Sequence, residues 1–239
     1  ILQRMNRTVF HNPVELMQNI AQVTSFLRKK ITAAGGDPLR ETLNLIPTTN
    51  GSWFFTDERG EFWRAFLFIS DASCYDAVTD PKLFYETGKA FGRFQQMLSD
   101  FPSASLFETI PDFHNTPLRF QALLQAAQAD PKGRLKNVSE EMAFFLDRTD
   151  DYGVAERMKV SGELPLRVTH NDTKLNNIMI DDATGEGICV IDLDTIMPGL
   201  SIFDFGDSIR FGASTAAEDE QNVSRVSLSL PLFESYTEG

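Results

Sequence analysis

The stretch Val168–Ile180 reads VTHNDTKLNNIMI, and the interpretation of the whole chain depends on it. Its apolar ends predict two buried strands, and the polar segment between them holds His170, Asp172, Lys174 and Asn177. The Asp172 carboxylate is a candidate general base for a substrate hydroxyl, and the Asn177 amide oxygen suits Mg²⁺. Lys174 can meet a phosphate as a point charge, while His170 is a candidate for orienting the loop or contacting substrate. The pattern therefore predicts a loop built for phosphate chemistry.

A further carboxylate follows one predicted strand later, in GICVIDLD at 187–194. Asp192 closes an apolar run, so we expect it to be fixed at a strand end as a second magnesium ligand. We expect Asp194 to support this site from behind rather than to lie free in solvent. Phosphoryl transfer needs a positioned metal, a base and positive charge more than covalent chemistry. An ordinary polar turn is the alternative, but it leaves the matched polar positions and the strand-end carboxylate unexplained.

The order of these residues resembles the catalytic loop of the kinase-like fold, in which His, Asp and Asn stand as they do at 170, 172 and 177. Ile191-Asp192 resembles the metal aspartate of aminoglycoside and choline phosphotransferases. More narrowly, four segments together look like the N-acetylhexosamine 1-kinase group: ILQRMN, IPDFHNTPLRF, LRVTHNDTKLNNIMI and GEGICVIDLDTIMPGLSIFDFGDSIRFGA. The resemblance covers most of the chain. It implies transfer of phosphate from ATP, with Mg²⁺, to the anomeric hydroxyl of an N-acetylated hexosamine.

The resemblance also implies roles for residues near the start of the chain. Arg4 would replace the lysine that positions ATP, with Gln3 as the rival because the strand register is open. Glu15 would be its partner on the first helix, although a helix-capping role explains Glu15 equally well. The resemblance further implies a Gly-rich ATP loop before Ile1 and a helical segment after Gly239.

Two residues in PDFHNT are implied as sugar contacts. They are Asp112 and His114, and the alternative for His114 is a capping or packing role before the helix that starts at Thr116. A literal Asp-Phe-Gly triplet at 204–206 competes with Asp192 for the metal role. It lies too far beyond the loop and lacks a strand directly before it. We therefore expect Asp204 to brace the loop structurally.

The predicted architecture is α+β, a two-lobe protein-kinase-like fold with a small antiparallel sheet and a mainly helical second lobe. Residues 1–70 are the expected partial N-terminal lobe: a strand within 1–10, a helix from Pro13 to the Gly35-Gly36 pair, a hairpin turning at 57–60 and a buried strand at 66–69. Residues 71–239 are the expected catalytic lobe, with helices starting at Pro81 and Thr116 and a third at 139–148.

Composition limits the partners. The chain has 239 residues, 42% of them apolar, and a net charge of −12, which argues against nucleic acid and an anionic membrane. The sequence shows no run of the roughly 20 apolar residues that cross a bilayer and no signal peptide. Cys74 and Cys189 lie among apolar neighbours, so we expect buried free thiols and a reducing cytoplasm. The expected partners are a sugar and a nucleotide, with the oligomeric state open.

Three rival functions are kept. An aminoglycoside, choline or homoserine phosphotransferase would use the same loop, and an acidic protein would suit such cations. A protein kinase is disfavoured because Asn171 stands where most regulated ones have Arg, and the stretch from Asp192 to Asp204 leaves no room for a long activation segment. The third rival is a catalytically silent nucleotide-binding module. The argument against it is that the set of Asp172, Asn177 and Asp192 is intact.

Overall fold

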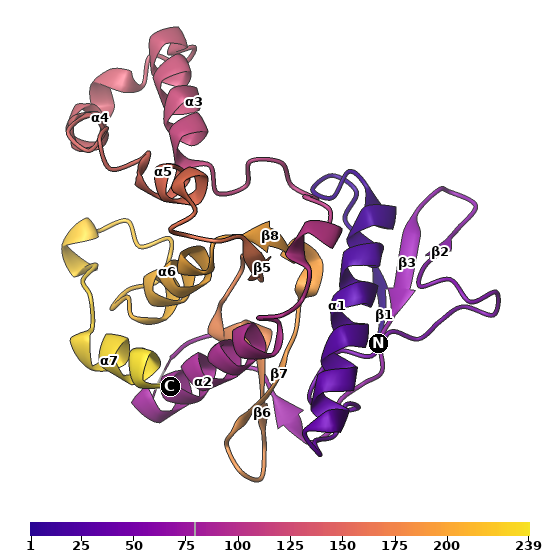
Figure 1. The fold of residues 1–239 in the computed structure, drawn as a ribbon. Helices are drawn as coiled ribbons and strands as arrows, with labels where there is room; N and C mark the ends of the chain where they lie inside the picture. Colours follow the sequence, from indigo (N-terminus) through magenta and orange to yellow (C-terminus); the bar gives the residue numbers. More distant parts are fainter. Residues whose placement is uncertain (79) are drawn as a thin grey trace. The chain divides into compact units, whose positions relative to one another are not determined.

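The computed structural model describes residues 1–78 and 80–239, and it divides into two compact units (Figure 1). The larger unit combines Ile1–Thr109 with Arg167–Gly239, and the smaller unit is Ile110–Leu166. The lobe boundary expected near residue 70 falls inside the larger unit. The division into 1–70 and 71–239 therefore stays a prediction, and each compact unit is described by itself below.

The larger unit holds all the strands that the structure describes, in three small antiparallel sheets with the orders β1-β3-β2, β4-β6-β7 and β5-β8. Its strands are β1 (Leu2–Arg4), β2 (Phe55–Thr56), β3 (Phe62–Ala65), β4 (Ala72–Ser73), β5 (Arg167–Thr169), β6 (Ile178–Asp181), β7 (Gly187–Val190) and β8 (Met197–Gly199). Its α-helices are α1 (Pro13–Ala33), α2 (Pro81–Met97), α6 (Ser201–Gly212) and α7 (Leu230–Glu238).

The hairpin of β2 and β3 forms where the sequence predicts it. The Asp57 carboxylate accepts hydrogen bonds from the backbone N–H groups of Arg59 and Glu61 and from Nε1 of Trp63, each at 2.9 Å. Gly60 has a φ of 77°, a conformation that glycine adopts at little cost. In the same sheet β1 pairs with β3 so that Gln3 lies opposite Arg64.

Helix α1 begins as its sequence predicts. Asn12 caps it by accepting the N–H of Glu15 at 3.3 Å, and Pro13 occupies the first turn. Leu16, Ile20, Val23 and Leu27 recur at helical spacing and are buried. On the same helix Asn19 is fully buried and donates to the backbone oxygen of Ile196 at 3.0 Å. This bond ties α1 to the chain entering β8.

The strand expected at 66–69 does not form. Phe66 makes a single bridge with Leu45, and Phe66 and Ile69 are buried. Leu67 and Phe68 are exposed and line a cavity instead of entering the core. The N–H of Phe66 donates to the backbone oxygen of Ile1 and that of Leu67 to the backbone oxygen of Asn44, each at 2.9 Å, so single hydrogen bonds hold the segment in place of a regular strand ladder.

The helical part of the larger unit is built around α2. Phe84, Phe91, Phe94 and Leu98 lie on one face of this helix or just after it, and all are buried. Helix α7 packs on α2, and the ring of Tyr236 lies 4.8 Å from that of Phe84. This packing supports β7, which pairs with β6; the two strands follow the polar loop at 170–177 and lead to Asp192.

The smaller unit is helical, with α3 (Thr116–Ala129), α4 (Ser139–Leu146) and α5 (Val154–Ser161). Asn115 caps α3 by accepting the N–H of Leu118 at 3.2 Å, and Pro117 lies in the first turn. The helices expected from Thr116 and near 139–148 therefore both form. Small antiparallel sheets beside a mainly helical remainder confirm the predicted α+β class.

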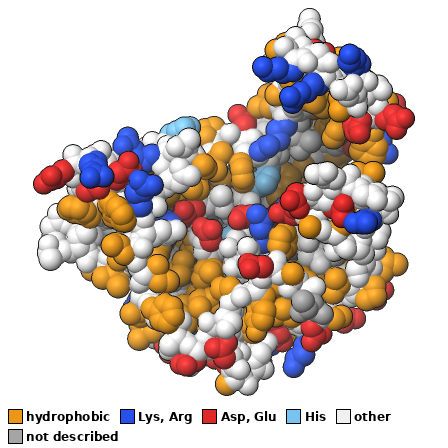
Figure 2. Space-filling model, turned by 180° about the vertical axis from the view of Figure 1, so that it is seen from behind, with side chains coloured by type: hydrophobic (Ala, Val, Ile, Leu, Met, Phe, Trp, Pro, Cys, Tyr) orange, Lys and Arg blue, Asp and Glu red, His pale blue; other side chains and the backbone are white. Residues whose placement is uncertain are grey.

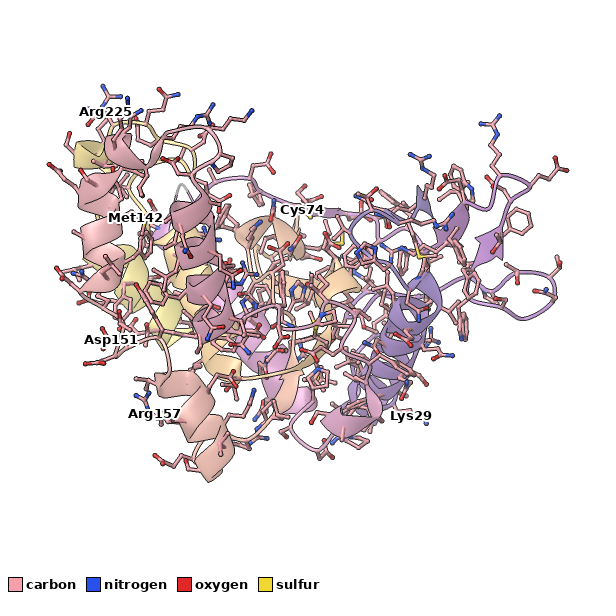
Figure 3. All side chains as sticks on the ribbon, turned by 90° about the horizontal axis from the view of Figure 1, so that it is seen from above. Lys29, Cys74, Met142, Asp151, Arg157 and Arg225 are labelled. Atoms are coloured by element: carbon pink, nitrogen blue, oxygen red, sulfur yellow. The ribbon has the colours of Figure 1, made fainter. Side chains whose placement is uncertain are left out.

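One prediction about the cysteines is wrong. Cys189 is buried in β7, but Cys74, labelled in Figure 3, is exposed just after β4. The strand preceding it is only two residues long, so the chain leaves the sheet before the thiol can be covered. Across the residues that the structure describes, no helix is both long and apolar enough to cross a membrane.

Candidate active site

The polar loop connects β5 to β6, and Asp204 on α6 fixes its backbone. The Asp204 carboxylate accepts the backbone N–H groups of His170 at 2.9 Å and Asn171 at 2.8 Å. Gln95 donates to the same carboxylate from α2 at 2.6 Å. Burial raises the pKa of Asp204, and the bonds from His170 and Asn171 act in the opposite direction. The Asp-Phe-Gly triplet lies within α6. Because its carboxylate holds two backbone N–H groups of the loop, Asp204 braces the loop as expected.

His170 lies inside the protein. Its ring is fully buried, 5.6 Å from the ring of Phe91 and 6.2 Å from that of Phe94. Nε2 lies 2.9 Å from the backbone oxygen of Ile191, and Nδ1 accepts the N–H of Asp172 at 3.3 Å. Both contacts are satisfied by the tautomer with its proton on Nε2. This position favours a role in orienting the loop over contact with substrate.

Asp172, Lys174 and Asn177 are brought together by the loop. Lys174 Nζ lies 3.0 Å from Asp172 Oδ1, and this hydrogen bond is the main reason that the Lys174 pKa is raised. Asn177 Nδ2 donates to the backbone oxygen of Asp172 at 2.8 Å and to Asp172 Oδ2 at 3.1 Å. The Asp172 side chain keeps about a third of its surface, 34%, accessible. A substrate hydroxyl can therefore reach it.

A cavity of about 410 Å³ lies next to this loop. Its walls are mostly apolar, with Phe66, Phe68 and Met179 among them. At its polar end it collects side chains from four separate parts of the chain: Gln3, Arg64, Asn177, and the pair Asp192 and Asp194. Acidic and apolar side chains adjoin one another on the face of the molecule in Figure 2. An apolar pocket with a few convergent polar groups is typical of a ligand site.

Asn177 and Asp192 fit the donor set of a divalent cation. Because Asn177 Nδ2 is committed to Asp172, the amide oxygen of Asn177 is the atom left to act as a ligand. Partial burial and the neighbouring Asp194 raise the pKa of Asp192, and a cation would relieve both effects. Within the described chain no three His, Cys, Asp or Glu side chains gather as metal ligands. Such a two-residue site would depend on phosphate oxygens to complete it.

The predicted nucleotide residues lie apart from this cavity. Arg4 is exposed on β1 and is not part of the cavity lining, whereas its rival Gln3 is. Glu15 is half-buried in the first turn of α1, where its N–H is capped by Asn12. Arg64, which was not among the predicted site residues, lies at the cavity with its side chain 2% exposed and pairs with Asp194 at 2.5 Å. An arginine inside an apolar strand, FWRA, was the available signal.

Asp112 and His114 belong to the smaller unit. Asp112 has a φ of 56° and accepts a hydrogen bond from Asn115 Nδ2 at 2.9 Å, next to the cap of α3. The His114 ring lies 4.5 Å from that of Phe113, tilted by 52°. Both residues thus take part in the turn before α3, and their role as sugar contacts stays a prediction.

A family profile and several solved structures are similar to this chain. The profile of the family described as APH, phosphotransferase enzyme family, matches residues 38–235. Similar solved structures include an aminoglycoside phosphotransferase from Alicyclobacillus acidocaldarius, with a TM-score of 0.58 and 12% identity over 87% of this chain and 60% of that one.

Two further structures share the fold. An amicoumacin kinase in complex with AMP-PNP, Ca²⁺ and Ami has a TM-score of 0.57 and 11% identity, covering 100% of this chain and 64% of that one. A microcompartment-associated aminopropanol kinase has a TM-score of 0.54 and 14% identity, covering 99% and 73%. The chain thus spans 60% and 64% of the first two structures. At these identities the likeness establishes the two-lobe, kinase-like fold.

Proposed function

The chain belongs to the APH phosphotransferase family, and we propose that it transfers the terminal phosphoryl group of ATP to a hydroxyl of a small molecule. The observation that carries this proposal is the placement of Asp172. Its carboxylate is accessible on a loop braced by Asp204, next to a cavity that carries Asn177 and Asp192.

Asp172 would act on the acceptor. Its carboxylate accepts the proton of the attacking hydroxyl, or orients that hydroxyl for in-line attack. The contacts from Lys174 and Asn177 hold the carboxylate in one orientation. His170 fixes the backbone of the loop through Ile191 and so sets the position of Asp172.

Asn177 and Asp192 would hold Mg²⁺ through their side-chain oxygens. A magnesium–ATP complex, when bound, supplies the phosphoryl group and neutralises part of its charge. Lys174 lies next to Asp172 and provides a cation for the group being transferred. The apolar walls of the cavity suit the flat base of a nucleotide, while its polar end suits the phosphates.

For the acceptor we propose the anomeric hydroxyl of an N-acetylhexosamine. This choice rests on the sequence resemblance described above, with Asp112 and His114 as the proposed sugar contacts. The second candidate is an amine-bearing alcohol such as an aminoglycoside, choline or homoserine. The net charge of −12 favours a cation, and two similar structures are an aminoglycoside phosphotransferase and an aminopropanol kinase.

An acceptor panel separates these candidates. The full-length protein is incubated with Mg-ATP and, in turn, N-acetylated hexosamines, aminoglycosides, choline and homoserine, while ADP release is recorded. We expect turnover on an N-acetylhexosamine, with the product phosphorylated at the anomeric position by ³¹P NMR. Turnover on an amine-bearing alcohol alone would select the second candidate. Binding of Mg-ATP without turnover on any acceptor would instead favour a silent nucleotide-binding module.

A further inference from the structure

A buried arginine stands at the polar end of the cavity and has no part in the function proposed so far. Arg64 lies in the middle of β3, and its side chain is 2% exposed. Charged side chains are seldom buried to this degree unless they are paired. The contacts of this guanidinium therefore indicate what it is held there to do.

Gln3 and Asp194 hold the guanidinium from two sides. Nε and Nη2 donate to Gln3 Oε1 at 3.0 and 2.9 Å, and Gln3 lies directly opposite Arg64 in the sheet. Nη1 lies 2.5 Å from Asp194 Oδ1, on the segment that follows Asp192. The first contact anchors the arginine within its own sheet. The second is an ion pair to the loop that carries a proposed metal ligand.

The guanidinium retains donor capacity. Among the described residues, oxygen accepts hydrogen bonds from two of its five N–H groups, both at Gln3 Oε1. Nη1 forms the ion pair with Asp194 and lies 4.0 Å from Met17 Sδ. Arginine is suited to contact a phosphate through two donors while it stays fixed by others. Gln3 is neutral, so it orients the guanidinium without removing its charge.

The charges of the cavity lining indicate that this arginine is needed for binding phosphate. Of the side chains that line the cavity in the described structure, Arg64 is the one Lys or Arg, against the carboxylates of Asp192 and Asp194. A polyphosphate entering beside two carboxylates is repelled unless cations compensate. Lys174 is not part of this lining. Beside the proposed Mg²⁺, the positive charge of the protein at this end of the cavity therefore comes from Arg64.

We propose that Arg64 is a phosphate-binding residue of the nucleotide site, held in place by Gln3 and shared between Asp194 and a phosphate oxygen of the bound nucleotide. The inference rests on the proposed function, because it takes the cavity as the nucleotide site. It assigns to β3 the positive charge that the sequence analysis placed at Arg4 on β1.

The test is a binding series along the phosphate chain, with no acceptor present. Dissociation constants for adenosine, AMP, ADP and ATP with Mg²⁺ are measured by calorimetry for the wild type, Arg64→Met and Arg64→Lys. The matched control is Arg59→Met, which removes an exposed cation from the same hairpin. In Arg64→Met we expect ADP and ATP to bind about 10- to 100-fold more weakly, while adenosine changes by less than about twofold. Arg64→Lys should recover part of the loss.

The double variant Arg64→Met/Asp194→Asn guards against misfolding, because it removes the carboxylate that the single variant leaves unpaired. It should keep the same selective loss of ADP and ATP. Equal weakening of adenosine and ATP would reduce Arg64 to a structural role and overturn the inference. Unchanged ATP affinity in Arg64→Met would overturn it too, while leaving the proposed function intact. If the wild type bound no nucleotide at all, both proposals would be wrong.

Discussion

The carboxylate of Asp204 accepts the backbone N–H of His170 at 2.9 Å, across a sequence separation of 34 residues. It also accepts the next N–H, from Asn171, whose φ of 66° is unusual for a residue other than glycine. Two consecutive N–H groups aimed at one buried carboxylate hold the loop in a conformation that it would not adopt alone. The position of Asp172 thus depends on a residue that is not part of the cavity lining.

The first prediction concerns this brace. In Asp204→Asn an NH₂ group replaces one acceptor and faces a donor, because His170, Asn171 and Gln95 already point N–H groups at the carboxylate. We expect a loss of about 1–3 kcal/mol in the free energy of unfolding, seen as a fall in Tm, and a large loss of kcat. Thermal denaturation and steady-state kinetics measure the two effects.

The control for this variant is Asp100→Asn, an exposed carboxylate paired with Lys30 at 2.6 Å. Its Tm should stay close to that of the wild type, since isolated surface ion pairs contribute little. A metal role for Asp204 would give a different pattern, in which Tm is preserved and activity returns at high Mg²⁺ concentration.

The second prediction compares two glycines of α6. Gly206 is exposed within the helix, and a Cβ placed there would meet no atom within 4 Å. Gly206→Ala should therefore stabilise the protein by about 0.5–1 kcal/mol and leave kcat unchanged. Gly212 is buried, and a Cβ there would collide with the ring of Phe84. Gly212→Ala should cost about 1–3 kcal/mol.

Urea denaturation of the two variants checks the second prediction. If Gly206→Ala abolished activity, the Asp-Phe-Gly triplet would be a functional hinge rather than part of a helix. If Gly212→Ala were as stable as the wild type, the close contact of Gly212 with the ring of Phe84 would be wrong.

The features that the sequence predicted are those encoded locally. Asn12-Pro13 marks the start of α1, and Asp57 to Gly60 mark the hairpin turn, because caps and turns need only neighbouring residues. The brace by Asp204 was also predictable, because along the sequence the Asp-Phe-Gly triplet lies too far beyond the loop to take the metal role. These assignments needed no knowledge of which strands pair.

The features that the sequence did not predict depend on pairing between segments that are far apart in the chain. Whether Arg4 or Gln3 faces the nucleotide depends on the strand register, since a shift of one residue exchanges the two faces of a strand. The position of Arg64 opposite Gln3, and its ion pair with Asp194, join segments far apart in the sequence. The exposure of Leu67 and Phe68 reflects a cavity that no local pattern encodes.

The third prediction uses the two thiols. Cys74 is exposed at the cavity wall, but the protein atoms around it partly desolvate the thiol, and this desolvation, with a smaller effect from Asp76, raises the pKa of Cys74. Full burial raises the pKa of Cys189 far more. The thiolate is the reactive form, so at pH 7–8 Cys74 should react with iodoacetamide more slowly than a free thiol, and its rate should still be rising at pH 9. Cys189 should react only after denaturation. Mass spectrometry of the alkylated protein measures both rates.

The same thiol also reports on the cavity. Cys74 lines it together with Asn177 and Asp192, so saturating Mg-ATP should slow alkylation of Cys74 while denatured protein reacts equally with and without nucleotide. An alkylation rate that Mg-ATP does not change would place the nucleotide elsewhere.

The role of Asp172 as the base can be tested with the variant Asp172→Asn, for which Asp182→Asn is the control. Asp182 is an exposed carboxylate that accepts a hydrogen bond from Ser73 and lies outside the proposed site. This control should retain wild-type kinetics. Asn177→Ala makes the opposite comparison, because it removes a proposed metal ligand. It should weaken Mg-ATP binding as well as turnover.

The last prediction is that Asp172→Asn loses most turnover while Mg-ATP binding stays near that of the wild type. Asparagine keeps the shape and can still accept the contact from Asn177 Nδ2, but it cannot take a proton. A positioned base contributes about 10²- to 10⁴-fold, and a loose transition state places the loss toward the lower end of that range. The effect should fall on kcat rather than on nucleotide affinity, because Asn177 and Asp192 are the proposed metal ligands. Steady-state kinetics on the best acceptor, with calorimetry for Mg-ATP, separates the two. A variant that kept more than about half of the wild-type kcat would remove Asp172 from the role of base, and the loop would then serve nucleotide binding alone.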